Sequence, residues 1–368
     1  TDPPDDIAGE TGLVDFFYAT HVVNGNLVHL GENQYGGWLM VDDADGGEGT
    51  SAYRDMTTVT VFDFTAPGAP VQRGTIDIEG YYNSPVLLEG SFNRYPYAYG
   101  QEIVQVREDL LTFVAVNPWD DIDDAVSIVD FSDPDTPALT ARHRLAEEDA
   151  AGFFADAEVL YYSYSVDAED DGEGRSQIRY YLGRIDMADP DDPQDLPGIN
   201  IPGICLGMDE TGLTAYTIDN QWLPDAATDV AYTFNALRIE DGTAYLMGET
   251  VLPEYYSSFL IADGLAYVGG YSWWWYGGDM IIIDLTDPEN LEQYDTGLPD
   301  YVRGILGARD RTAFYSMWGG LGCYDVRDPG SPELIDFRYG YTYNSRVAFS
   351  GDRAFLPMGY YGLWVKAL

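Results

Sequence analysis

The chain consists of short apolar or alternating segments that are separated by turn residues. Between residues 257 and 297, for example, SSFLIADG, LAYVGGYS, DMIIIDLTD and LEQYDTG follow one another. Segments of this length with period-two alternation or a continuous apolar run are typical of β-strands, and the Asp-Gly and Asp-Pro dipeptides that end them are typical of tight turns. The pattern therefore predicts an all-β protein.

One seven-residue pattern recurs five times, as an apolar strand with a central Asp that leads into a Pro. Proline forces the preceding residue out of the helical conformation, and an Asp side chain can accept hydrogen bonds from the amides of a turn. We therefore expect each strand to stop there and the Asp to be a turn residue rather than a functional one. The copies are VFDFTAP (Val61–Pro67), IVDFSDP (Ile128–Pro134), RIDMADP (Arg184–Pro190), IIDLTDP (Ile282–Pro288) and CYDVRDP (Cys323–Pro329).

Two degenerate copies, Leu237–Asp241 and Leu363–Leu368, extend the series, and in the second of them Lys366 takes the place of the Asp. Aligned on that place, the copies fall at positions 63, 130, 186, 240, 284, 325 and 366, and the last two intervals are both 41 residues. A minimum period of this length, with four strands in each period, is the length of a propeller blade. We predict a seven-bladed β-propeller of four-stranded antiparallel blades.

The last repeat ends after its third strand, at Leu368. A propeller must join its ends or leave open sheet edges, so we expect Leu13–Thr20 to supply the missing outer strand of the last blade. This assignment divides the chain into an acidic N-terminal arm, residues 1–12, and a single propeller domain, residues 13–368.

The repeated strand resembles that of the secreted bacterial LVIVD-repeat proteins, in which a Leu-Val-Ile-Val-Asp-like strand is followed by Ser, Asn or Asp, then Pro, then a second Pro. The match is clearest in AVSIVDFSDPDTPAL and DMIIIDLTDPENL, weak in the fourth repeat and nearly absent in the seventh. The resemblance implies a secreted or surface-attached bacterial β-propeller, and it offers no catalytic residues to carry over.

The charge of the chain restricts its partners. Eighteen basic against 63 acidic residues give a net charge of −45, which argues against nucleic acid and anionic membrane surfaces as partners. No apolar run is long enough to span a membrane. The start at Thr1 is that expected of a mature secreted protein, and the acidity is also typical of proteins adapted to high salt. We expect Cys205 and Cys323 to be buried thiols rather than a disulfide, because they fall on strands of different repeats.

Acidic clusters suggest cation binding. Asp167, Glu169 and Asp171 alternate as the first ligands of a calcium loop do, and Gly172 follows. Ile178 stands where an EF-hand needs a bidentate Glu, so only a shorter calcium loop fits. A solvated run of charge is the alternative. The other candidate calcium ligands are Asp42, Asp43 and Asp45 with Glu48, and Asp120, Asp121 and Asp123 with Asp124.

Aromatic residues gather in the predicted loops between second and third strands, such as Asp42–Thr58 and Val166–Ser176, and in the loops between blades. In a four-stranded blade both kinds of loop lie on one face. Exposed Trp and Tyr are typical of protein interfaces and of platforms for sugar rings, whereas the alternative is that wide loops bury their own rings. The candidate interaction surface is Tyr81, Tyr82, Tyr95, Tyr97, Trp119, Trp222, Trp273, Trp274, Trp275 and Tyr276.

No sequence motif indicates catalysis. The chain has no GxSxG, HExxH or CxxC motif, and His21, His29 and His143 are too few and too scattered for a metal or haem centre. We therefore expect a non-catalytic extracellular structural or interaction protein that associates with itself, as a filament or sheath at the cell surface. The alternatives are a lectin-like propeller that binds polysaccharide and, third, a glycan-active enzyme.

Overall fold

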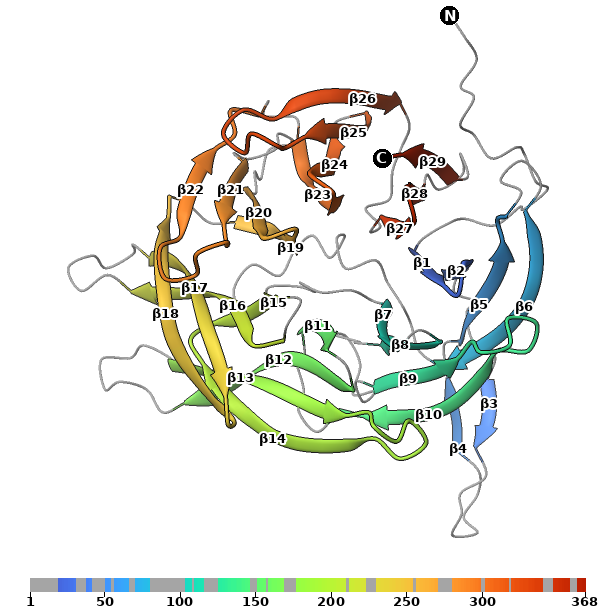
Figure 1. Cartoon of the computed structure of the whole chain (residues 1–368). Coiled ribbons are helices and arrows are strands. Elements are labelled where there is room, and N and C mark those ends of the chain that lie inside the picture. Colours follow the sequence, from blue (N-terminus) through green and yellow to red (C-terminus); the bar gives the residue numbers. More distant parts are fainter. Residues whose placement is uncertain are drawn as a thin grey trace, which may run out of the picture.

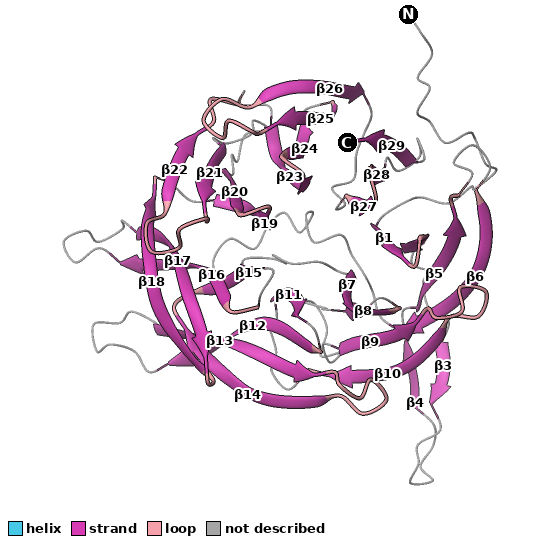
Figure 2. Cartoon of the chain, viewed as in Figure 1, coloured by secondary structure: helices cyan, strands magenta, loops and turns pink. Residues whose placement is uncertain are grey.

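The computed structural model describes residues 19–30, 38–41, 50–53, 56–65, 70–79, 103–107, 109–115, 125–145, 151–156, 158–168, 177–209, 212–222, 230–253, 256–270, 280–298, 302–317, 319–339, 347–357 and 363–368. Seven antiparallel sheets are arranged around a central axis, and the regular structure described is strand throughout (Figures 1 and 2). The predicted seven-bladed β-propeller is confirmed. No helix in the described residues is long and apolar enough to cross a membrane.

Each blade runs from an inner strand near the axis to an outer strand at the rim (Figure 1). The first three blades are β1 (Ala19–Val23), β2 (Asn26–Leu30), β5 (Met56–Asp63), β6 (Val71–Glu79); β7 (Ile103–Arg107), β8 (Leu110–Ala115), β9 (Ala125–Asp130), β10 (Ala138–Arg144); and β11 (Ala151–Asp156), β12 (Val159–Ala168), β13 (Gln177–Asp186), β14 (Gln194–Ile201). The fourth and fifth are β15 (Ile204–Met208), β16 (Thr214–Trp222), β17 (Val230–Glu240), β18 (Thr243–Leu252); and β19 (Tyr256–Ala262), β20 (Leu265–Gly270), β21 (Met280–Asp284), β22 (Glu292–Asp295). The last two are β23 (Val302–Arg309), β24 (Thr312–Met317), β25 (Gly320–Asp325), β26 (Glu333–Tyr339); and β27 (Ala348–Ser350), β28 (Arg353–Pro357), β29 (Leu363–Ala367).

The repeated Asp ends the third strand of its blade and caps the turn that follows. In the fifth blade, Asp284 Oδ1 accepts hydrogen bonds from the Thr286 amide at 2.8 Å and from Thr286 Oγ1 at 2.7 Å. The second Asp of the motif acts in the same way, since Asp287 Oδ1 accepts from the Glu289 amide at 3.1 Å. Asp63, Asp130, Asp186 and Asp325 each accept from the amide two residues on. The predicted turn role of the repeated Asp is confirmed.

A second hydrogen bond fixes the end of the same strand and shows which residues are equivalent between blades. Asp284 pairs with Leu265, and the next amide, that of Leu285, donates to the Gly264 carbonyl at 2.9 Å. The residues with this geometry in the two degenerate copies are Arg238 and Ala367. The alignment is therefore wrong by two residues at position 240 and by one residue at position 366.

The cause of the larger shift is the turn of the fourth blade. There β17 continues to Glu240, and Asp241 and Gly242 form a two-residue turn with φ values of 51° and 74°. Positive φ at both central residues is the geometry of a tight hairpin, which needs no Asp-Pro turn.

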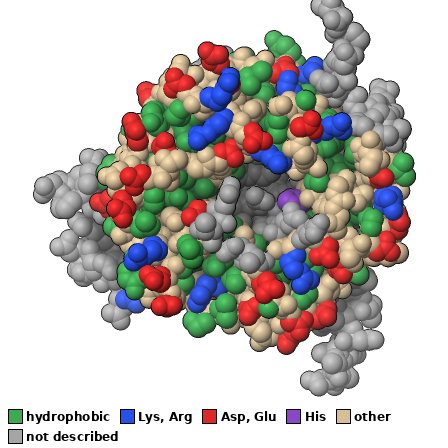
Figure 3. Space-filling view, viewed as in Figure 1, with side chains coloured by type: hydrophobic (Ala, Val, Ile, Leu, Met, Phe, Trp, Pro, Cys, Tyr) green, Lys and Arg blue, Asp and Glu red, His purple; other side chains and the backbone are tan. Residues whose placement is uncertain are grey.

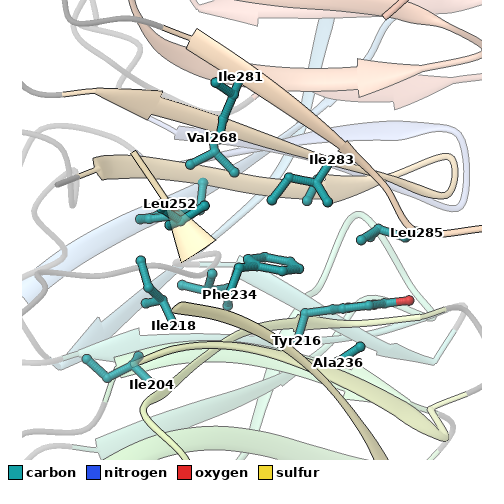
Figure 4. Packing of buried hydrophobic residues seen from close by; sticks show 13 residues of the cluster. Ile204, Tyr216, Ile218, Phe234, Ala236, Leu252, Val268, Ile281, Ile283 and Leu285 are labelled. Atoms are coloured by element: carbon teal, nitrogen blue, oxygen red, sulfur yellow. The ribbon is translucent and has the colours of Figure 1, made fainter. Parts of the chain in front are cut away.

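The core is a closed series of seven hydrophobic clusters, each of which lies between two neighbouring blades. Figure 4 shows the cluster between the fourth and fifth blades, in which Tyr216 and Phe234 of the fourth blade pack near Ile283 and Leu285 of the fifth. The cluster between the first and seventh blades closes the ring, and in it the rings of Phe64 and Phe355 have centroids 6.2 Å apart. The apolar strands are therefore buried by the adjacent blades on both sides.

Neighbouring blades also interlock at the rim. At two of the junctions, the turn after the repeated motif lies against a glycine in the outer strand of the preceding blade. A Cβ added to Gly74 of β6 would lie 2.5 Å from Pro137 Cδ of the second blade, and one added to Gly248 of β18 would meet the Pro288 carbonyl of the fifth. Arg73 Nε and Nη2 donate to Asp135 of the next blade at 2.6 and 2.7 Å.

The closure of the last blade is only partly described. β27, β28 and β29 form a three-stranded sheet, and β27 contacts β1 of the first blade. Ala19 and Thr20, the last residues of the expected closing strand, belong instead to β1 and pair with Leu30 and His29. Residues 13–18 and the arm of residues 1–12 lie outside the described residues, so the closing strand stays a prediction.

The first blade holds a feature that the sequence did not reveal. The connection from β2 to β5 was expected to be a loop from Asp42 to Thr58. Within it, β4 (Thr50–Tyr53) pairs with β3 (Trp38–Val41), and β5 begins at Met56. The expected loop is therefore wrong at Thr50–Tyr53 and from Met56 onward. The sequence did not reveal the hairpin, because the Thr50–Tyr53 segment is too short to give a clear period.

We predict that the cap at Asp284 is needed for stability. Asp284→Ala should lower the free energy of unfolding by about 1–2 kcal/mol, because two turn donors lose a charged acceptor. Asp284→Asn keeps an acceptor oxygen and should lose clearly less. Urea unfolding of the three proteins measures the difference, and equal losses in the two variants would contradict the capping role.

The ion pair between the sixth and seventh blades should make part of the stability pH-dependent. Lys366, the only lysine in the sequence, places Nζ 2.8 Å from Asp336 Oδ2. Partial burial raises the pKa of Asp336, but Lys366 and the Phe337 amide outweigh this effect and set the pKa below its usual value. A carboxyl with a depressed folded-state pKa contributes stability above its unfolded pKa of about 4, and that contribution is lost as the pH falls through the folded value.

Asp336→Asn should therefore cost about 1 kcal/mol or less between pH 5 and 7, and its cost should shrink below about pH 4. Urea unfolding at each pH measures it. A cost that is constant from pH 3 to pH 7 would show that the charge of Asp336 contributes nothing.

Candidate functional site

The candidate calcium ligands lie almost entirely outside the described residues. Asp167 is described, and it is exposed near the end of β12, where it pairs with Ile178. It therefore belongs to a strand rather than to the expected loop from Val166. The described part of the chain contains no group of three or more His, Cys, Asp or Glu residues that could hold a metal ion. The other candidates, Glu169, Asp171, Asp42, Asp43, Asp45, Asp120, Asp121 and Asp123, lie outside it.

Most of the candidate aromatic surface also lies outside the described residues. Trp222 ends β16, where its backbone pairs with Val230, but its side chain is not among those described. The strand order confirms that the loops in question join second and third strands, as between β12 and β13. The other members of the surface, Tyr81, Tyr82, Tyr95, Tyr97, Trp119, Trp273, Trp274, Trp275 and Tyr276, lie outside the described residues.

Of the three histidines, His143 has a clear structural partner. His143 of β10 lies with Nε2 3.0 Å from Asp195 Oδ1 of β14, so the two side chains link the outer strands of the second and third blades. His21 of β1 is half-buried and also has a partner. Nothing is described of the side chain of His29.

The titratable groups with the largest shifts are buried between blades and are held neutral. Burial raises the pKa of the Cys205 thiol to about 12 and that of Cys323 to about 11, and both cysteines are free. The expectation of two buried thiols is confirmed. Burial also raises the pKa of Tyr267 and of Tyr315, whose hydroxyl groups have no hydrogen-bond partner among the described residues. Neutral thiols and phenols in packed interfaces are unsuited to act as nucleophiles or bases.

A cavity of about 230 Å³ opens between the first and seventh blades. Its apolar part lies over the closing cluster at Phe64 and Phe355, and its polar part includes the exposed side chains of Asp352 and Arg353. Because the charged side chains are directed to solvent, the cavity alone does not define a ligand class. The remaining residues around it are Val22, Gly25, Leu27, Thr65, Ser350 and Gly351.

The rim carries the most distinctive described surface. Among the described residues, eleven large apolar side chains are exposed, and eight of them lie on outer strands, most of these on β18 and β26. Figure 3 shows apolar, acidic and basic side chains interspersed on the face in view, around a central hollow. The outer strands are also the edges of their sheets, which leaves backbone groups available for pairing. The eight side chains are Val71, Leu139, Tyr245, Leu246, Val251, Leu334, Ile335 and Tyr339.

Comparison with known proteins supports the fold and does not identify a family. No family model matches the chain, and no curated protein does. Among solved structures, the β-propeller domain of the Trilobed protease from Pyrococcus furiosus, reported to have an open velcro topology, is similar with a TM-score of 0.50 and 8% identity over 96% of this chain and 95% of that one. At such identity the likeness extends to the fold only.

Two further solved structures have a TM-score of 0.49 each. One is a functionally unknown protein from Desulfotomaculum acetoxidans, with 9% identity over 81% of this chain and 85% of that one. The other is a candidate 6-phosphogluconolactonase from Bacteroides fragilis, with 12% identity over 90% and 88% of the two chains.

We predict that both cysteines are unreactive in the folded protein. Neither thiol is exposed, and thiolate formation is disfavoured at neutral pH by burial. Labelling with an aromatic disulfide reagent should report two thiols in denaturant and only slow reaction without it, at a rate that follows unfolding. Immediate native labelling, or an intact mass lower than that of the reduced chain by two hydrogen atoms, would contradict this arrangement.

Proposed function

We propose that this protein is a non-catalytic extracellular propeller of the LVIVD-repeat type that serves as a structural or interaction protein and associates with copies of itself, as a filament or sheath at the bacterial cell surface. The observation that carries the proposal is the concentration of exposed apolar side chains on the outer strands. Exposed apolar groups on unpaired sheet edges favour contact with another protein.

The net charge of the chain determines which contacts allow copies to associate. A net charge of −45 opposes the close approach of identical copies. Exposed apolar contact area, screening salt and bound cations are the three means by which such copies can still associate. The exposed side chains of the rim supply the apolar contact area, and a saline exterior would supply the screening salt.

The acidic clusters are suited to bind cations, the third means of association. Carboxylates that follow one another in the sequence, as at Asp120, Asp121 and Asp123, crowd negative charge within a distance that salt screens poorly. Calcium prefers oxygen ligands, and extracellular calcium modules bind at the concentrations found outside cells. Calcium bound to these clusters would both stabilise the monomer and lower the repulsion between copies.

The full chain should therefore form assemblies larger than a monomer, and calcium should promote them. We expect multi-angle light scattering and negative-stain electron microscopy to show larger species at high protein concentration with millimolar calcium. At the same ionic strength, a chelator should reduce both the assembly and the melting temperature. Magnesium at matched concentration controls for general screening.

Two outcomes would contradict parts of this proposal. A melting temperature unchanged by the chelator would remove the calcium role. A protein that stays monomeric at high concentration, in calcium and in high salt, would remove self-association. Binding to a glycan array by such a monomer would then favour a carbohydrate-binding propeller.

A further inference from the structure

The outer strand of the fourth blade, β18, differs from the other outer strands in its turn and its length. It is ten residues long and forms the edge of its sheet (Figure 1). Because Asp241 and Gly242 form a two-residue turn, the β17–β18 hairpin continues past the point where the other motif-bearing blades turn at Asp-Pro. The result is a long edge at the rim.

Three of the five exposed side chains of this edge are apolar, and the other two are Thr243 and Glu249. Tyr245, Leu246 and Val251 are 47%, 56% and 64% exposed. Glu249 is the only charged residue in the strand, whereas β6, β10 and β26 each carry three charged or His residues. Of the remaining outer strands, β14 contains a proline and β22 has only four residues. Charged residues, prolines and short length are the usual means of preventing edge pairing, and of these β18 has only the single charge of Glu249.

The backbone of β18 is available for pairing over part of its length. In a two-residue hairpin the residues next to the turn, Glu240 and Thr243, form a hydrogen-bonded pair, so the amide and carbonyl groups of Ala244 point away from β17. At the other end the Val251 carbonyl already accepts a hydrogen bond from Gln293 Nε2 at 2.8 Å. The open edge therefore extends from Ala244 to about Glu249.

The charges beside this edge complement those of a second, antiparallel copy. The Arg238 guanidinium lies 5.3 Å above the centre of the Tyr245 ring, at the end of the strand near the turn, and Glu249 lies toward the other end. Arg238 Nε is also 3.4 Å from Glu240 Oε2, but the pair is exposed, and the guanidinium has further donors for a second carboxylate. If two such strands run antiparallel about a two-fold axis at Leu246, the end of each strand that carries Arg238 and Tyr245 lies beside the end of the other that carries Glu249. Elsewhere on a surface with this net charge, two copies would mostly oppose like charges.

We infer that β18 pairs antiparallel with β18 of a second copy of this chain, so that the two fourth blades form one continuous sheet across a two-fold axis. The inference rests on the proposed self-association and assigns one contact to it. Such a contact is isologous and closes a pair, so a longer assembly needs a second surface. Association through this edge should strengthen with added salt, because screening lowers the repulsion between copies.

The first test compares Leu246→Lys with Leu139→Lys by sedimentation equilibrium at several salt concentrations. Leu139 is a matched control, because it is 45% exposed and also lies beside a bulge in an outer strand, β10. Both variants change the net charge equally. Leu246→Lys should weaken dimer formation at least tenfold, and Leu139→Lys should leave it unchanged. Equal effects of the two variants would overturn the inference.

The second test avoids any change of charge. Across the axis, the side chains at position 246 should come close enough for Leu246→Cys to form a covalent dimer under mild oxidation, whereas Leu139→Cys should not. The native cysteines are buried and should not interfere. Wild-type dimers without such cross-linking would overturn the β18 contact but leave self-association standing. A wild-type protein that never associates would overturn both.

Discussion

The packing of each blade against the next is the interaction on which the rest of this structure depends. A single four-stranded sheet cannot bury its own apolar faces, so every blade needs a neighbour on each side. The seven interblade clusters meet this need only because the last of them joins the first blade to the seventh. The apolar faces of all seven blades are therefore buried only when the ring is closed. Closure thus fixes the number of repeats.

The repeated Asp-Pro turn contributes to the same packing in two ways. Within a blade, its carboxylates cap the turn, as Asp130 and Asp133 do by accepting from the amides of Ser132 and Asp135. Between blades, the turn lies against a glycine of the preceding outer strand, as at Gly74. The fourth blade shows that the cap can be replaced by a tight hairpin, while its interblade clusters with the third and fifth blades remain intact.

The fold was open to prediction from the sequence because its signal is local and repeated. Each strand of the fifth blade is a short apolar segment between turn residues, and five intact copies of the motif fix the period. The errors fall where that local signal is missing: Arg238 and Ala367 hold the repeated place without an Asp, and the β3–β4 hairpin has no counterpart in the described parts of the other blades. The candidate calcium and aromatic sites depend on how long loops converge, which no local period encodes.

The edge of β18 was missed for a different reason. Its apolar residues are those of an ordinary strand, and only the order of the strands in the described sheet shows that β18 has no outer neighbour.

The closing cluster also has a consequence for how the ring forms and opens. Phe64 and Phe355 are separated by most of the chain, so the contacts of this cluster have a larger loop-closure entropy than those of the other six clusters. The other six clusters join blades that are consecutive in sequence and can assemble in stages. The seam between the first and seventh blades is therefore the last to form and the first to separate under strain. A force that pulls β1 away from β29 acts directly on this seam, so the ring would open there while the other six interfaces stayed closed.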